Sequence, residues 1–257
     1  MNIIKLLKKH KIIIIIILII IIIIFYIIKN NNNKKKKKIA VCTWYDNGIK
    51  KYADIAKDIN QKYCDLHGYD LIIKHERKLK ERQQQWECIP AVLDIVEENK
   101  YEYIVWIDAD AVFRLNHDKF NLLETYINKN KDKDFILSAD VPGYDIINTG
   151  VFIVKSNDYT KNILKNIIKS ELKECKNYNK FGHEQECMCH FFKNNINNFK
   201  INTIILEEGI LQSWHKANKY INKVYDNSLI LHLAGVNNEK RYEIFKNLKE
   251  NDYSSYF

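Results

Sequence analysis

Two carboxylates stand two residues apart at the end of an apolar run, in the segment YIVWIDADAVF of residues 103–113. Asp108 and Asp110 would repel each other there, because like charges at short range disfavour each other's ionisation. A divalent cation held by oxygen ligands would remove that cost. The pair therefore indicates a metal site, and the alternative is a strand that simply ends in solvated aspartates.

The elements before this pair predict an α/β fold with a parallel sheet. Residues 104–107 form a continuous apolar run, which is typical of a strand buried on both faces. The upstream pattern predicts strands at 39–45 and 70–74 and helices at 52–66 and 83–100. This β-α-β-α-β order is typical of a parallel sheet with helices on both faces. The first strand and the strand before Asp108 then converge on one nucleotide pocket, since open α/β sheets bind ligands at the carboxyl ends of their strands.

The second half of the chain also contains predicted strands and helices. A polar triplet, residues 148–150, interrupts the apolar run 146–154 and predicts a bulge or a close approach of the backbone to a ligand. The chain has only seven glycines and contains neither a G-x-G-x-x-G motif nor a P-loop. The diphosphate of a nucleotide would therefore have to be bound in another way, for example through a metal ion. The other predicted elements are helices at 121–130, 158–175, 181–192 and 238–250 and strands at 135–139, 201–206 and 228–234.

The N-terminal segment predicts a membrane anchor. Residues 12–28 are almost all isoleucine, and a run of this length reaches the lower limit of ~17–25 residues for a transmembrane helix. No small-residue cleavage site follows, which argues against a cleaved signal peptide. We expect a short basic tail at 1–11, a transmembrane signal-anchor at 12–28, an Asn/Lys stem at 29–38 and a catalytic domain at 39–257.

The net charge of +9 belongs to these flanks and not to the folded part. Residues 1–38 contain ten lysines and no acidic residue, which leaves a net charge of −1 for residues 39–257. A basic nucleic-acid-binding face is therefore not expected. Lysines lie on both sides of the apolar run, so their distribution does not determine the orientation in the membrane.

Six cysteines lie in the catalytic part, without a CxxC pair that would indicate structural zinc. Their even number permits disulfides, but their spacing selects no pairing. Cys187 and Cys189 are too close for an easy mutual bridge. We expect most of the six to be ordinary buried thiols.

Four motifs occur in an order that is characteristic of one enzyme family. They are WIDADAVF (106–113), INTGVFIVKSN (147–157), HEQE (183–186) and LHLAG (231–235). Over about residues 39–250 the chain resembles the galactosyl, mannosyl and xylosyl transferases of glycosyltransferase family thirty-four, which are type II membrane enzymes of the GT-A fold. The resemblance implies a Rossmann-like GT-A domain that transfers a hexose or pentose from a nucleoside diphosphate sugar to a glycan acceptor, with retention of configuration.

The resemblance also implies a metal site. Asp108 and Asp110 match the D-x-D that bridges Mn²⁺, or another divalent cation, to the diphosphate. His232 matches a histidine that supplies a further ligand, and manganese accepts carboxylate and imidazole together. The alternative for His232 is a core histidine on an apolar strand.

By the same resemblance, Glu184 and Gln185 match an acidic-Gln pair beside the anomeric carbon, where they would stabilise an oxocarbenium-like centre. The alternative is a solvated helix N-terminus, where acids are common. The remaining expected donor-binding residues are Thr43 and Trp44 by the nucleotide base, Asn148 and Gly150 along the donor sugar, Ala109 in the D-x-D motif and Gly235 in the last motif.

The chain departs from the family at two places. Cys88, in the segment WECIP (86–90), stands where the family usually has lysine, and residues 208–226 show little that matches. The implied partners are a UDP-sugar or GDP-mannose donor, a glycan acceptor and a membrane. The implied location is the Golgi membrane, with a lumenal catalytic domain.

Three other functions remain open from the sequence. A haloacid-dehalogenase-like phosphohydrolase also places D-x-D-x-[T/V] at a strand end, but it needs a later lysine and acidic pair that the chain lacks. A retaining transferase of another GT-A family would share the metal site and differ around Glu184. An inactive sugar-nucleotide-binding membrane protein is compatible with Cys88.

Overall fold

The computed structural model describes residues 19–20, 37–115, 122–141, 146–176, 183–216, 218 and 228–250. The chain divides into two units, residues 1–36 and residues 37–257. Within the described residues, no helix has both the length and the apolar character needed to cross a membrane. The predicted anchor at 12–28 lies outside the described residues except for Ile19 and Ile20, so the anchor and the basic tail stay predictions. The first strand begins at Lys37, inside the predicted stem.

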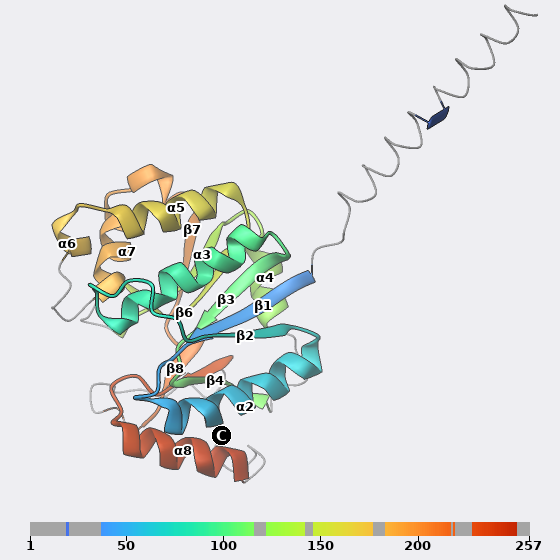
Figure 1. Ribbon diagram of the computed structural model, residues 1–257, viewed down its shortest axis with the longest axis vertical. Coiled ribbons are helices and arrows are strands. Elements are labelled where there is room, and N and C mark those ends of the chain that lie inside the picture. Colours follow the sequence, from blue (N-terminus) through green and yellow to red (C-terminus); the bar gives the residue numbers. More distant parts are fainter. Residues whose placement is uncertain are drawn as a thin grey trace, which may run out of the picture. The chain divides into compact units, whose positions relative to one another are not determined.

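Six strands form the large sheet, in the order β2-β1-β3-β6-β5-β7 (Figure 1). As predicted, β1 is parallel to both β2 and β3. β6, whose direction the sequence pattern does not predict, runs antiparallel to β3 and β5, which makes the sheet mixed. The chain between β5 and β6 is too short for the crossover of a dozen or more residues that a parallel neighbour needs. The six are β1 (Lys37–Trp44), β2 (Asp70–Lys74), β3 (Tyr101–Ile107), β5 (Phe135–Ala139), β6 (Ile147–Lys155) and β7 (Thr203–Leu206).

A second sheet of three short strands lies beside the end of β3. It consists of β4 (Ala111–Phe113), β8 (Gln212–Trp214) and β9 (Ile230–His232), in the order β4-β9-β8. β9 corresponds to the predicted last strand. The sequence patterns did not predict β8, because three residues are too few to show a period.

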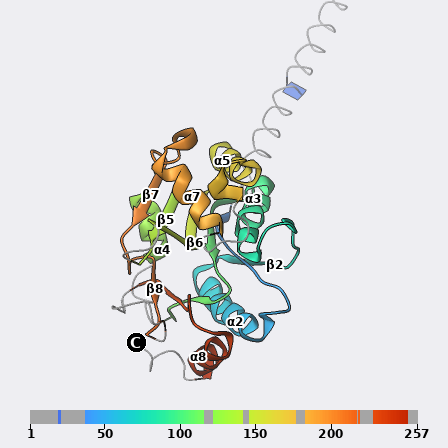
Figure 2. The same cartoon turned by 90° about the vertical axis from the view of Figure 1, so that its left-hand side faces the viewer.

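Helices cover both faces of the large sheet (Figures 1 and 2). α3, α5 and α7 pack against one face, and α2 and α4 pack against the other. α8 packs on α2 and on the small sheet. The helices are α2 (Lys50–His67), α3 (Cys88–Glu98), α4 (Leu122–Lys129), α5 (Asp158–Lys169), α6 (Lys173–Lys176), α7 (His183–Lys193), α8 (Asn238–Glu250), and the 3₁₀ turns η1 (Gln84–Glu87) and η3 (Ile196–Asn198).

Two predicted helices are shorter in the structure. The helix expected at 83–100 divides into η1 and α3, which places Pro90 in the first turn of α3, where its missing N–H removes no helical hydrogen bond. The helix expected at 158–175 ends at Lys169, because Ser170 has an extended backbone with ψ of 129°. Asn157 caps the start of α5 by accepting a hydrogen bond from the Thr160 N–H.

The apolar run before Asp108 is continuous because β3 is buried on both faces. Ile104 and Trp106 pack among the residues under α3, α5 and α7. Val105 and Ile107 pack on the opposite side, toward α2 and α4. The alternation of a strand therefore requires apolar side chains at every position, and the first polar residue, Asp108, marks the edge of the core.

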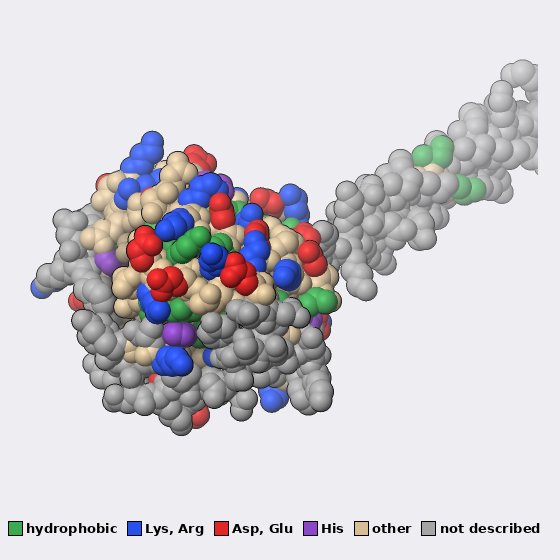
Figure 3. Space-filling model, turned by 90° about the horizontal axis from the view of Figure 1, so that it is seen from below, with side chains coloured by type: hydrophobic (Ala, Val, Ile, Leu, Met, Phe, Trp, Pro, Cys, Tyr) green, Lys and Arg blue, Asp and Glu red, His purple; other side chains and the backbone are tan. Residues whose placement is uncertain are grey.

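The charged surface carries both signs. On the face shown in Figure 3, acidic and basic side chains lie interspersed among the described residues. Of the exposed ion pairs, Lys50–Asp54 lies within α2 and Lys249–Asp58 joins α8 to α2. Pairs of this kind contribute roughly 0–1 kcal/mol each, so the surface adds little to the stability of the core.

One pair of cysteines is bonded. Cys175 of α6 and Cys187 of α7 form a disulfide. A cross-link over a loop of this size stabilises a fold by about 3 kcal/mol, and here it fixes the helix that carries Glu184 and Gln185. The expectation of buried thiols is correct for the other four, Cys42, Cys64, Cys88 and Cys189.

Candidate active site

The backbone after β3 turns sharply and brings the two aspartates to one side. The Asp108 N–H donates to the Gly150 carbonyl on β6 at 2.8 Å, and the Ala111 N–H donates to the Asp108 carbonyl at 3.0 Å. The indole N–H of Trp106 donates to Asp108 Oδ1 at 2.9 Å. The end of β3 is therefore held by β6, and one oxygen of Asp108 is oriented by the residue two positions earlier.

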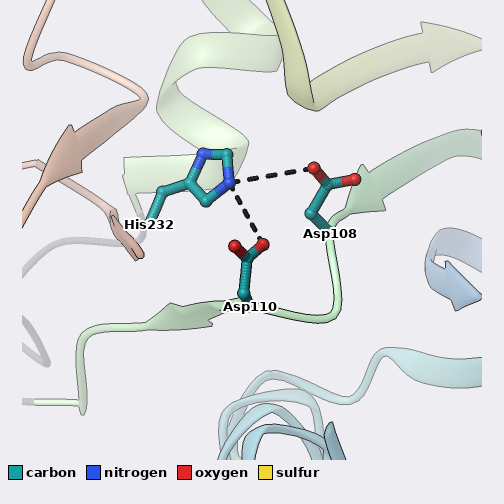
Figure 4. A group of neighbouring side chains, drawn as sticks. All are labelled: Asp108, Asp110 and His232. Atoms are coloured by element: carbon teal, nitrogen blue, oxygen red, sulfur yellow. Dashed lines mark ion pairs between the residues drawn. The ribbon is translucent and has the colours of Figure 1, made fainter. Parts of the chain in front are cut away.

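Asp108, Asp110 and His232 converge at this turn (Figure 4). His232 Nε2 lies 3.2 Å from Asp110 Oδ1 and 3.7 Å from Asp108 Oδ2. The pairing of Ala111 with His232 between β4 and β9 accounts for this arrangement, since it sets the end of β9 beside the turn. His232 is thus brought to Asp108 and Asp110 from a part of the sequence more than 120 residues away.

The site holds its negative charges unequally. The side chain of Asp108 is 41% exposed, whereas those of Asp110 and His232 are only 10% and 3% exposed. Partial burial raises the pKa of Asp108, and the negative charge of Asp110 adds to the rise while His232 opposes it. Burial would also raise the pKa of Asp110, but His232 and Arg241 outweigh it and lower that pKa. Arg241 of α8 forms an ion pair with Asp110 Oδ2 at 2.5 Å.

His232 fits only because residue 150 is a glycine. A Cβ added at Gly150 would lie 2.2 Å from Cε1 and 2.9 Å from Nδ1 of His232. The Trp214 ring lies on another side of the imidazole, with the ring centroids 5.1 Å apart. The interruption of the apolar run at Gly150 therefore marks a close approach, and the group that approaches in this structure is His232.

A network of hydrogen bonds joins β6, β5 and α7 behind the aspartates. Asp140, at the end of β5, accepts from the amide groups of Asn148 at 3.3 Å and Gln185 at 2.9 Å. Gln185 Oε1 accepts in turn from the Thr149 N–H at 3.1 Å. The Thr149 hydroxyl donates to Glu184 Oε1 at 2.8 Å. Thr149 thus connects Glu184 and Gln185 to the strand that contacts Asp108.

Glu184 is a neutral acid in this setting. Glu184 is 6% exposed, and its Oε2 has no hydrogen-bond partner among the residues that the structure describes. Burial raises the pKa of Glu184 to about 8, despite the hydrogen bond from Thr149. A solvated helix N-terminus does not describe Glu184, while Gln185 beside it is partly exposed.

The other predicted donor-binding residues lie around this centre at different depths. Thr43 and Trp44 end β1, whose neighbour in the sheet is β3. The Thr43 hydroxyl is buried and has no partner within the described residues. Ala109 lies in the turn between the aspartates. Gly235 lies in the turn after β9 with φ of 73°, a conformation that favours glycine, and it faces Asn218.

Several residues that contact the site were not predicted from the sequence, among them Thr149 and Trp214. Gln212 is on a strand too short to predict, Asp140 follows an ordinary strand, and Arg241 is one of several charged residues on α8. Only the contact of Trp106 was predictable from the sequence, because residues two positions apart in a strand, such as 106 and 108, point to the same side.

The cluster has the chemistry of a metal site. One ligand atom from each of Asp108, Asp110 and His232 lies within 4.8 Å of the others. Two carboxylates and an imidazole suit a divalent transition metal. A cation there would also offset the repulsion that raises the pKa of Asp108, so the residues present fit such an ion.

Comparison of the sequence with family models gave one match. The model of the galactosyl transferase GMA12/MNN10 family matches residues 22–131 and 115–243. The chain belongs to this family. It is therefore a glycosyltransferase, and the phosphohydrolase alternative is not supported. A comparison with curated protein sequences gave no match.

Solved structures share the fold of this glycosyltransferase. One is a glycosyltransferase involved in the glycosylation of the major capsid of PBCV-1, with a TM-score of 0.64 and 18% identity over 81% of this chain and 98% of that chain. Another is the galactosyltransferase LgtC in complex with donor and acceptor sugar analogues, with a TM-score of 0.53 and 10% identity over 82% of this chain and 95% of that one. The domain is thus a mixed α/β GT-A fold.

The first prediction follows from the close packing of Gly150 against the His232 ring. We expect Gly150→Ala to lower the free energy of unfolding by about 1–3 kcal/mol, the usual cost of overpacking, because the new Cβ and the His232 ring cannot occupy the same space. Chemical denaturation measures the change. Gly48→Ala is the matched control, since the atoms nearest to its Cβ would be those of the Asp46 side chain, at 3.1 Å or more. Equal stability of Gly150→Ala and the wild type would contradict the close packing.

Glu184 generates a prediction about pH. The folded state keeps the Glu184 proton up to a pKa of about 8, whereas the unfolded chain releases it near 4.3. The free energy of unfolding must therefore fall as the pH rises between these values. We expect Glu184→Gln to remove this pH-dependent loss of stability. The loss amounts to about 1.4 kcal/mol for each unit by which the pKa of Glu184 differs between the folded and unfolded states.

The measurement is denaturant unfolding of both proteins from pH 4 to pH 8 in EDTA. The variant should gain stability over the wild type as the pH rises, and the difference should vanish near pH 4. Glu239→Gln, whose side chain is 78% exposed, controls for the loss of one negative charge. Parallel stability curves for Glu184→Gln and the wild type would show that Glu184 is ionised in the fold.

Proposed function

We propose that this glycosyltransferase is metal-dependent and retaining, and that it moves a hexose or pentose from a nucleoside diphosphate sugar to a glycan acceptor. The observation that carries the proposal is the convergence of Asp108, Asp110 and His232 within 4.8 Å at the carboxyl end of β3. Open α/β sheets bind nucleotides at this edge, and the family supplies the reaction class.

Mn²⁺, or another divalent cation, is the proposed cofactor, held by Asp108, Asp110 and His232. Such a cation would stabilise the negative charge of the departing diphosphate, so that no leaving-group acid is needed. Asp110 and His232 are buried and form the fixed part of the site, while Asp108 is 41% exposed and accessible to a substrate. Arg241 keeps Asp110 ionised, which a ligand carboxylate must be.

Glu184 and Gln185 are proposed to act beside the anomeric carbon. Gln185 is fixed by Asp140 on one side and by the Thr149 N–H on the other. A dipole held in this way needs no reorganisation as positive charge develops on the sugar, which is the basis of electrostatic stabilisation. Glu184 is buried and supports the same strand through the Thr149 hydroxyl.

The donor is proposed to be a UDP-sugar or GDP-mannose. The nucleotide would lie toward the ends of β1 and β3, where Thr43 and Trp44 are placed and the Thr43 hydroxyl lacks a partner within the described residues. Asn148, Gly150, Ala109 and Gly235 are proposed to line the donor. The family description, galactosyl transferase, makes UDP-galactose the first donor to test.

The test is donor turnover by the full-length protein in detergent. We expect Mn²⁺-dependent hydrolysis of one of four donors: UDP-galactose, UDP-glucose, UDP-xylose and GDP-mannose. Asp110→Ala should reduce the rate by about 100-fold or more, since even the loss of an outer-shell partner costs up to about that much. EDTA should abolish the reaction, and NMR should show the α anomer of the released sugar first if the enzyme is retaining.

Asp132→Ala is the matched control, because this aspartate is 71% exposed and pairs only with Lys133 among the ion pairs of the described residues. Nucleotide binding without turnover of any donor would favour an inactive sugar-nucleotide-binding protein. Turnover that is unaffected by EDTA and by Asp110→Ala would refute the metal-dependent mechanism.

We further propose that the protein is a single-pass type II protein of the Golgi membrane, with its catalytic domain in the lumen. The isoleucine-rich segment 12–28 is the proposed anchor. The Cys175–Cys187 disulfide supports a lumenal domain, because disulfides persist in oxidising compartments and are rare in the cytosol.

Protease treatment of intact membrane vesicles tests this orientation. The domain from residue 37 onward should be protected until detergent is added. Protein alkylated before lysis should yield a peptide pair joined through Cys175 and Cys187 in mass spectrometry, while Cys189 on the same helix should remain unpaired. Digestion without detergent, together with reduced Cys175 and Cys187, would place the domain on the cytosolic side.

A further inference from the structure

The imidazole of His232 has a second contact, on the side away from the aspartates. His232 Nδ1 lies 2.8 Å from Gln212 Oε1. Both residues are almost fully buried, with exposures of 3% for His232 and 1% for Gln212. Gln212 begins β8, and Trp214 of the same strand pairs with His232 across the small sheet.

The hydrogen bonds around Asn148 fix which end of the Gln212 amide faces His232. The Gly150 backbone N–H, which can only donate, points at Asn148 Oδ1 at 3.0 Å. That oxygen is therefore an acceptor, and the Gln212 group that lies 2.8 Å from it must be the NH₂. The opposite orientation of Asn148 would also turn its oxygen toward the carboxylate of Asp140. The Gln212 oxygen is thus left facing His232.

This orientation determines where the neutral imidazole carries its proton. A ring nitrogen next to the Gln212 oxygen must be the N–H donor, so Nδ1 is protonated and Nε2 keeps its lone pair. Nε2 is the nitrogen that faces Asp108 and Asp110. The lone pair is consequently directed at the place where a cation would lie.

We propose that Gln212 is a positioning residue that holds His232 in the Nδ1–H form and so presents Nε2 as a metal ligand. The inference deepens the proposed function and rests on it. Outer-shell acceptors of this kind orient metal-bound histidines and increase their basicity. The chain of contacts starts at a backbone N–H, passes through Asn148 and Gln212, and ends at His232, so each step fixes the next one.

The packing around the ring supports the same role. The Cε1 edge of the imidazole lies where a Cβ of residue 150 would be, and Trp214 covers another side. These contacts position the ring but contain no hydrogen-bond acceptor for Nδ1. Gln212 is therefore the group that selects the tautomer, while Gly150 and Trp214 set the position of the ring.

The test is Mn²⁺ binding to the full-length protein in detergent, purified without a polyhistidine tag and labelled with ¹⁵N-histidine. Calorimetry gives the affinity, and pulsed electron paramagnetic resonance detects a histidine nitrogen bonded to Mn²⁺. Gln212→Leu removes the acceptor, and we expect a 10–100-fold lower affinity together with loss of the nitrogen coupling. Gln212→Glu keeps an acceptor beside Nδ1 but loses the NH₂ that donates to Asn148, so it should retain the nitrogen coupling even if its affinity for Mn²⁺ falls.

Ser213→Ala is the matched control on β8. Ser213 is fully buried and bonds Arg114 and Ser228, away from His232. The Ser213→Ala variant should keep the coupling between Mn²⁺ and the histidine nitrogen, even if β8 is somewhat destabilised. If Gln212→Leu does not fold, the wild type loaded with diamagnetic Zn²⁺ gives the answer, since its His232 should show the ¹⁵N spectrum of an imidazole protonated at Nδ1.

The outcomes separate this inference from the proposed function. A wild-type protein that binds no Mn²⁺ overturns both. Mn²⁺ binding without nitrogen coupling in the wild type leaves the aspartate site in place and overturns the role of His232 and Gln212. Full affinity and coupling in Gln212→Leu overturn the role of Gln212 alone.

Discussion

The site depends on one electrostatic constraint, which is that two carboxylates must lie together where a buried strand ends. Asp108 and Asp110 remain together because positive or polar groups from elsewhere contact each of them. Asp110 contacts His232 and Arg241, and Asp108 accepts a hydrogen bond from Trp106. The small sheet and α8 supply His232 and Arg241, so the C-terminal part of the chain completes a site that the first half begins.

The reversed direction of β6 is what makes the rest of the site possible. Because β6 is antiparallel to β3, its first residues lie beside the last residues of β3, as the pairing of Val151 with Ile107 shows. A parallel strand would bring its far end there and move Asn148, Thr149 and Gly150 away. β5 is antiparallel to β6 in turn, so its end delivers Asp140 to the same edge.

The sequence could predict the parts of the site that lie on long or chemically distinctive segments. The strand before Asp108 has a strong apolar pattern, and the D-x-D pair has a chemical meaning by itself. Gln212 could not be predicted in either way, because β8 is only three residues long and an isolated glutamine does not indicate a particular chemistry. The direction of β6 and the choice of Cys175 and Cys187 depend on tertiary packing, which no local period encodes.

The cysteine at position 88 is best understood together with Glu184. Burial, followed by the negative charges of Glu184 and Asp108, raises the pKa of the Cys88 thiol well above its ordinary value, so the thiol is neutral. Burial likewise keeps Glu184 protonated, with a pKa of about 8. A lysine at position 88 would place a positive charge beside Glu184 and favour its ionisation. The absence of a lysine at position 88 is therefore consistent with a protonated Glu184. Position 88 is thus coupled electrostatically both to α7, through Glu184, and to Asp108 at the end of β3.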